Sequence, residues 1–111
     1  MGIIASFPAP QTGQVGFERL ELNRILDLYG RMVTAGHWRD YALDFTRDLA
    51  RFSAFRRATE RPEYRIEKCP ALRHRQGVWA LFGESGQILK RGHDLPGILA
   101  PLERRLLKLV D

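Results

Sequence analysis

The sequence has a single cysteine, Cys69, among its 111 residues, so no disulfide can form within the chain. No apolar run approaches the roughly 20 residues that a membrane-spanning helix requires. The first ten residues lack a basic start and are interrupted by Pro8 and Pro10, which is not typical of a secretory signal. These absences predict a cytoplasmic protein without membrane association, whose core forms without disulfides.

Motifs that would indicate an enzyme are also missing. There is no Walker loop, dinucleotide fingerprint or Gly-x-Ser-x-Gly elbow. The three histidines, His37, His74 and His93, include no pair four residues apart, and one cysteine cannot make a cysteine-based zinc site. A nucleophilic Cys69 with His74 or His93 as base and Asp94 to orient it is conceivable, but a small structural side chain is favoured. We therefore expect no cofactor and no metal, and we rank an enzyme last.

A change of hydrophobic period is the clearest feature that the sequence does have. From Glu18 the apolar residues recur in steps of three and four, which predicts an amphipathic helix. Gly36 is suited to end this helix, because glycine accepts the left-handed conformation of the residue after a helix end. Beyond Gly36 the period becomes two, which predicts a strand over 40–45. The apolar positions of the helix are Leu22, Ile25, Leu26, Tyr29, Met32 and Val33.

The strand over 40–45 is predicted to pair with a second one in the segment LARFSAFRR. A turn at Arg47 and Asp48 places Leu43 opposite Phe52 on the core face, and Asp44 opposite Arg51 on the other. Both pairs are favourable cross-strand contacts. Arg-Asp is not a preferred two-residue hairpin loop, so a longer loop or a bulge is an alternative.

Three further elements complete the predicted fold. Pro62 and Pro70 bracket a third strand, EYRIEKC, and residues 77–92 form a hairpin whose first strand is apolar enough to be covered on both faces. Asp94 offers an N-cap for a last helix, in which Pro101 predicts a kink or two short helices. The chain is thus predicted to be α+β, with an antiparallel sheet of about five strands flanked by an N-terminal and a C-terminal helix. We expect a flexible tail over 1–14 and a single domain over 15–111.

The segment AGHWRDYALDF, residues 35–45, lies where the period changes, and its polar residues suggest a site. The favoured interpretation is architectural: Trp38 is buried between the helix end and the sheet, with Tyr41, Leu43 and Phe45 on the core face. The alternative is functional, with an active site or a binding clamp formed by His37, Trp38, Arg39, Asp40 and Tyr41.

Three segments resemble a known family: LYGRMVTAGHWRDYALDF, FSAFRRATERPEYRIEKCPAL and GQILKRGHDL. The chain is similar from about Val15 onward to small uncharacterised alphaproteobacterial proteins grouped as a domain of unknown function. The resemblance implies a bacterial cytoplasmic protein with no assigned activity, cofactor or partner. It carries no catalytic residue over to this chain.

The strongest functional signal is an uneven positive charge. The net charge is +5, arginine outnumbers lysine fifteen to three, and the basic residues concentrate between 51 and 75. We expect a small non-catalytic binding or regulatory module whose Arg-rich surface contacts nucleic acid or another anionic partner, such as an acidic protein. Two alternatives are a protein-interaction or homo-oligomeric module, using a sheet edge or the last helix, and an arginine excess that reflects base composition alone. The candidate anion-binding residues are Arg56, Arg57, Arg61, Arg65, Arg73, His74 and Arg75.

Overall fold

The computed structural model of the protein describes residues 9–57 and 61–110. The first eight residues of the expected tail therefore lie outside the described residues, as does Glu60. Residues 9–14 have no helix or strand and include a turn closed by the Gln14 N–H donating to the Gln11 carbonyl.

The first helix, α1 (Arg19–Thr34), ends as the sequence predicts. Gly36 has a φ of +86°, its N–H donates to the Val33 carbonyl, and the His37 N–H donates to the Met32 carbonyl. These two hydrogen bonds form a Schellman motif, which satisfies carbonyls that a helix end would otherwise leave unpaired. Glycine is required because the left-handed conformation is costly for residues with a Cβ.

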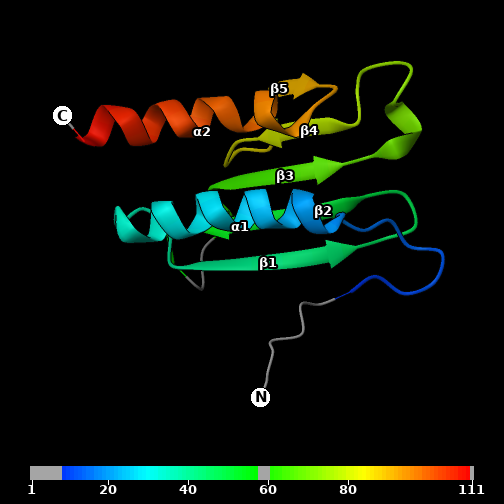
Figure 1. The fold of residues 1–111 in the computed structure, drawn as a ribbon, viewed down its shortest axis with the longest axis horizontal. Coiled ribbons are helices and arrows are strands. Elements are labelled where there is room, and N and C mark those ends of the chain that lie inside the picture. The colour runs from blue at the N-terminus through cyan, green and yellow to red at the C-terminus, as the bar shows by residue number, and fades with distance from the viewer. Residues whose placement is uncertain (1–8, 58–60, 111) are drawn as a thin grey trace.

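Five antiparallel strands form one sheet in chain order, which confirms the α+β prediction (Figure 1). Leu43 lies opposite Phe52 and Asp44 opposite Arg51, as the alternation predicted. The Arg51 side chain forms its ion pair with a different carboxylate: its Nε lies 2.9 Å from a carboxylate oxygen of Glu67 on the next strand. The strands are β1 (Asp40–Phe45), β2 (Ala50–Phe55), β3 (Tyr64–Lys68), β4 (Trp79–Phe82) and β5 (Ile88–Gly92).

The hairpin between β1 and β2 keeps the two-residue loop that its sequence disfavours. The Thr46 carbonyl accepts from the Val15 N–H instead of from Leu49 across the loop. The Thr46 hydroxyl oxygen takes its place and lies 3.2 Å from the Asp48 nitrogen and 3.1 Å from the Leu49 nitrogen. A side-chain acceptor therefore closes the loop, and no insertion or bulge is needed.

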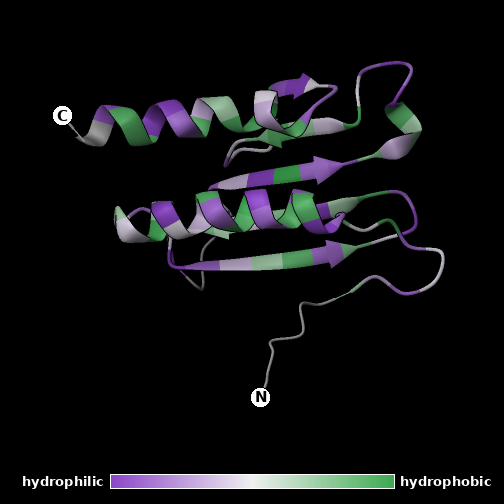
Figure 2. Ribbon diagram, viewed as in Figure 1, coloured by the Kyte–Doolittle hydropathy of each residue, from purple (hydrophilic) through white to green (hydrophobic). Residues whose placement is uncertain are grey.

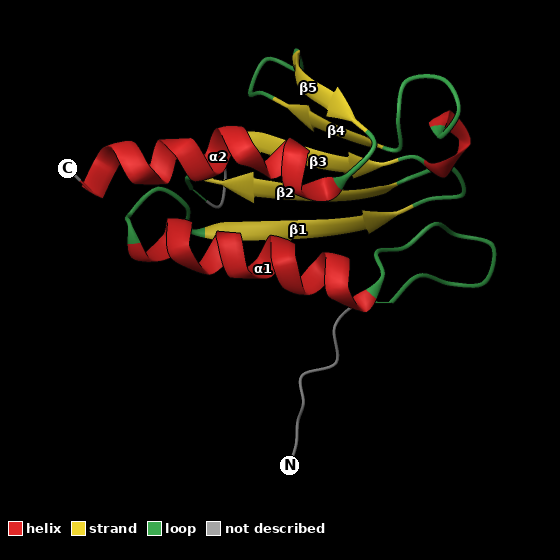
Figure 3. Cartoon of the chain, turned by 45° about the horizontal axis from the view of Figure 1, so that its top comes forward, coloured by secondary structure: helices red, strands yellow, loops and turns green. Residues whose placement is uncertain are grey.

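Both helices cover the same face of the sheet, with the core between them (Figures 1 and 3). Hydrophobic and hydrophilic residues are interspersed along each helix (Figure 2), as expected where apolar residues recur in steps of three and four. The last helix, α2 (Leu95–Val110), begins where the Asp94 carboxylate accepts from the Gly97 N–H, 2.8 Å away. It is one helix with Pro101 inside it, so of the two expected alternatives, a kink or two short helices, the second is wrong.

The opposite face of the sheet is covered by its own side chains. The Arg65 guanidinium lies 5.0 Å from the centre of the Phe82 ring, and Arg51 reaches Glu67 along the same face. Long arginine stems shield small neighbours from solvent, and Ser53 and Ala80 are buried although both described helices lie on the other face. Strand β4 is therefore buried on both faces, as its apolar sequence predicted.

Candidate functional site

The corner after α1 is built around Trp38, which is only 1% exposed. Its ring packs 6.0 Å from the ring of Tyr29, and its indole N–H donates to Glu63, 2.9 Å away. Tyr41 and Leu43 pack against the same core. The architectural interpretation of Trp38 is thus confirmed, since the indole fills the corner and lines none of the hollows described below.

Glu63, just before β3, links this corner to α2. The same carboxylate oxygen that accepts from Trp38 also accepts from the Arg105 guanidinium, 3.1 Å away, and Arg105 lies 3.4 Å from the Tyr64 hydroxyl. Burial lowers the pKa of Arg105, but the hydrogen bond and the charge of Glu63 outweigh burial and raise that pKa above its ordinary value. Arg105 is therefore a cation and acts only as a donor.

The second guanidinium nitrogen of Arg105 determines the tautomer of His37. It lies 3.2 Å from His37 Nδ1, and because arginine can only donate, Nδ1 must be the acceptor. The proton of the neutral ring then sits on Nε2. That nitrogen is buried and has no hydrogen-bond partner in the described part of the chain. An unsatisfied buried donor costs about 1–3 kcal/mol.

His37 lines two small hollows at this end of the molecule. One, of about 290 Å³, is bounded by Gly36, His37, Arg56 and Arg57. The other, of about 480 Å³, lies along α2 and is bounded by His37, Pro101, Arg104, Arg105 and Lys108. Five cationic side chains and no carboxylate line them. We call this region the His37 corner; it comprises His37, Arg56, Arg57, Arg104, Arg105 and Lys108.

The cations of the His37 corner differ in how far they are already neutralised. Arg56 is held by Glu84, with both contacts at 3.2 Å, and Arg105 is held by Glu63. Arg104 and Lys108 are exposed and make no ion pair within residues 9–57 and 61–110. These two carry the positive charge that is most available to an anion.

The basic residues singled out in the sequence lie at the two ends of β3. Arg56 and Arg57 follow β2 at the His37 corner, and Arg61 is exposed before β3. The others lie in or beyond the strand, and β3 alone spans about 16 Å, so Arg56 and Arg57 are separated from Arg73, His74 and Arg75 by the length of the strand. Arg65 lies over Phe82 with Glu67 nearby, while Arg73, His74 and Arg75 are exposed in the loop after β3.

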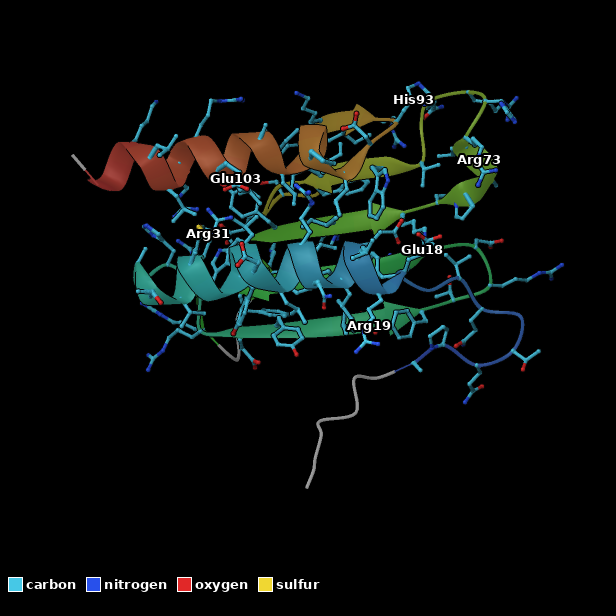
Figure 4. All side chains as sticks on the ribbon, viewed as in Figure 1. Glu18, Arg19, Arg31, Arg73, His93 and Glu103 are labelled. Atoms are coloured by element: carbon cyan, nitrogen blue, oxygen red, sulfur yellow. The ribbon has the colours of Figure 1, made fainter. Side chains whose placement is uncertain are left out.

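Figure 4 shows Arg73 at the opposite end of the molecule from Arg31, which lies in the last turn of α1. Three residues of the His37 corner were not selected from the sequence: Arg104, Arg105 and Lys108. The sequence feature that could have identified them is their helical spacing in α2, where they lie next to the leucines that indicated the helix.

In the described residues Cys69, the histidines and Asp94 are not joined by hydrogen bonds. Cys69 makes no hydrogen bond with His74 or His93, and the Asp94 carboxylate caps α2 instead of orienting a histidine. No group of three or more potential metal ligands is found among them. No helix in the described part of the chain is long and apolar enough to cross a membrane.

Comparison with known proteins gives a family but no activity. Residues 15–99 match the family model described as Protein of unknown function (DUF2794). No curated protein and no solved structure matches the chain. The matched range includes α1, the whole sheet and the first turns of α2, so it ends before Arg104 and Lys108.

Proposed function

The chain belongs to the family Protein of unknown function (DUF2794), and we propose that it is a non-catalytic binding module whose His37 corner holds an anionic group of a partner. The observation that carries the proposal is the set of five cations that line the two hollows shared by His37, a ring whose Nε2–H finds no acceptor among the described residues. An anionic oxygen is the acceptor that such a donor and such charges favour.

The end of α1 is capped by hydrogen bonds of its own backbone. Cations are often found at helix C-termini because they offset the helix dipole and pair with free carbonyls. Here the Schellman hydrogen bonds from Gly36 and His37 already satisfy two of those carbonyls. Arg56 and Arg57 come from the end of β2, and Arg104 and Lys108 from α2, so their convergence beside His37 is a property of the fold.

Binding of two labelled anionic probes, a short single-stranded RNA and a poly-glutamate peptide, tests the proposal by fluorescence anisotropy at low and high salt. Arg104→Gln with Lys108→Gln is expected to weaken binding about tenfold or more. The matched control is Arg73→Gln with Arg75→Gln, which removes the same charge at the other end of the sheet and is expected to change affinity by less than about twofold.

The comparison also distinguishes the alternatives. Equal losses in both double variants would show that only the net charge matters, and the His37 corner would then not be a site. A larger loss in the Arg73 and Arg75 variant would assign binding to the loop after β3, as the sequence alone suggested. Absence of binding to either probe at low salt would overturn the proposal. Salt must weaken any genuine contact, because screening and counterion release both act on it.

A further inference from the structure

A groove of about 980 Å³ runs between α1 and the last turns of α2 and reaches the His37 corner. Leu107 stands at its edge with 70% of its surface exposed, the second-largest exposure among the large hydrophobic residues described. Leu26 and Leu106 line the same groove, and a groove lined by several apolar side chains is typical of a surface that another molecule covers. The groove is lined by Leu26, Asp27, Gly30, Arg31, Thr34, Ala35, His37, Leu106 and Leu107.

The shape of the groove fits a helix. Its α1 wall runs from Leu26 to Ala35, about 14 Å of helix, which matches two to three turns of a partner. Gly30 lies in the middle of this wall, and a Cβ added there would meet nothing within 4 Å. Glycine inside a helix lowers stability relative to alanine, and it is used where another chain approaches closely.

The charges around the groove favour an acidic occupant. Arg31 lies 3.3 Å from Asp27 and 2.8 Å from Glu103, so one arginine ties α1 to α2 and neutralises much of the negative charge of the groove (Figure 4). The groove shares His37 with the hollow lined by Arg104 and Lys108, which have no carboxylate partner in the described part of the chain. The groove therefore adjoins positive charge at His37.

A second copy of this chain fits the groove poorly. In a symmetric pairing of grooves the second copy would insert its own Leu107, which is flanked on α2 by Arg104 and Lys108. Docking would place these cations against the same cations of the first copy, in a chain whose net charge is already +5. Like charges brought together across an interface oppose association.

We propose that the groove between α1 and α2 receives an amphipathic helix of a partner protein, with its apolar face on Leu26, Leu106 and Leu107 and its acidic residues at the His37 corner. The inference rests on the proposed function, because the corner supplies the anionic anchor. It goes further by naming the partner as an acidic helix. A nucleic acid has no apolar side chains to place on the leucines of the groove.

The test uses the full chain and two labelled peptides of about 18 residues, long enough for a helix to form. One carries leucine and glutamate at helical spacing, and the other has the same composition scrambled so that no apolar stripe remains. The amphipathic peptide is expected to bind about tenfold more tightly than the scrambled one. Leu107→Ser and Gly30→Phe are expected to abolish this difference, and both positions are exposed, so the fold tolerates them.

Leu20→Ser is the matched control, because Leu20 is 81% exposed on α1 but does not line the groove. It is expected to leave both affinities unchanged. Equal binding of the two peptides, weakened alike by Arg104→Gln with Lys108→Gln, would overturn the helix inference and leave the anion corner standing. Binding of neither peptide at low salt would overturn both. A dimer in sedimentation that Leu107→Ser dissolves would assign the groove to a second copy and overturn the inference.

Discussion

Trp38 and Glu63 are joined by a hydrogen bond of 2.9 Å that ties the end of α1 to the start of β3. The same carboxylate oxygen accepts from Arg105 of α2, so one side chain connects three separate parts of the chain. Glu63 is largely shielded from solvent, with 13% of its side chain exposed. The Glu63 carboxylate therefore links α1, β3 and α2. It also orients Arg105 toward His37.

Replacing Glu63 with Ala is expected to lower the free energy of unfolding by about 1–3 kcal/mol, because the Trp38 and Arg105 donors lose a shared acceptor. Urea unfolding followed by tryptophan fluorescence measures the loss. Glu84→Ala is the control: Glu84 and Arg56 are each 46% exposed, and such a surface pair contributes no more than about 1 kcal/mol. Equal effects of the two substitutions would contradict the linking role of Glu63.

The β1–β2 hairpin loop is expected to depend on the hydroxyl of Thr46. Thr46→Val keeps the shape of the side chain but removes the oxygen that lies near the Asp48 and Leu49 nitrogens, and we expect a loss of about 1 kcal/mol in unfolding free energy. Thr46→Ser retains the hydroxyl and should lose less. If serine and valine destabilise equally, the loop is closed by something other than this oxygen.

Gly77 and Gly86 both have positive φ values, +98° and +82°, but only Gly77 is crowded. A Cβ at Gly77 would overlap the carbonyl of Gly92, whereas a Cβ at Gly86 would meet nothing within 4 Å. Gly86→Ala is therefore expected to lower the free energy of unfolding by the backbone strain alone, about 1–2 kcal/mol. Gly77→Ala is expected to lower it clearly more, because the overlap with the Gly92 carbonyl adds to the strain. Thermal unfolding of the two variants side by side gives the comparison, and a Gly77→Ala that is no worse than Gly86→Ala would contradict it.

Tyr29 makes the stability of the folded protein depend on pH in the alkaline range. Burial, followed by the negative charge of Asp40, raises the pKa of the Tyr29 phenol above its usual value of about 10. The folded state therefore keeps this proton at pH values where the unfolded chain has lost it. The stability from the neutral phenol is complete below about pH 10 and is lost as the pH rises through the higher folded-state pKa.

Tyr29→Phe cannot ionise, so its urea midpoint is expected to fall less steeply than that of the natural protein between about pH 9.5 and 11. The difference between the two slopes, measured on the same buffers, isolates the contribution of this phenol. Identical slopes would show that Tyr29 titrates alike in the folded and unfolded chains.

The hydrophobic stripe of α1 was predicted only in part. Leu28 was not among the expected positions and is 1% exposed, while Val33 was expected and is 40% exposed. A helical stripe drawn from sequence has no fixed edges, because residues on either side of it satisfy the same spacing. The position of α2 and the sheet decides which edge is covered.

Several features were determined by the sequence itself, because their causes lie within a few residues. The end of α1 follows from Gly36, the start of α2 from Asp94, and the register of β1 and β2 from the pairing of Leu43 with Phe52. In each case a backbone conformation, a cap or a cross-strand pair links neighbours along the chain or across a short loop. These local interactions remain favourable however the rest of the molecule is arranged.

Only the tertiary structure decided which distant residues meet. His37 and Arg105 are 68 positions apart and come together because both helices lie on one face of the sheet with their C-terminal ends at the same side (Figure 1). The basic segment that is continuous in sequence is divided, because β3 carries the chain from Arg61 at one end of the sheet to Arg73 at the other. A strand separates its two flanks in space by its own length, whereas packing joins residues that the sequence keeps apart.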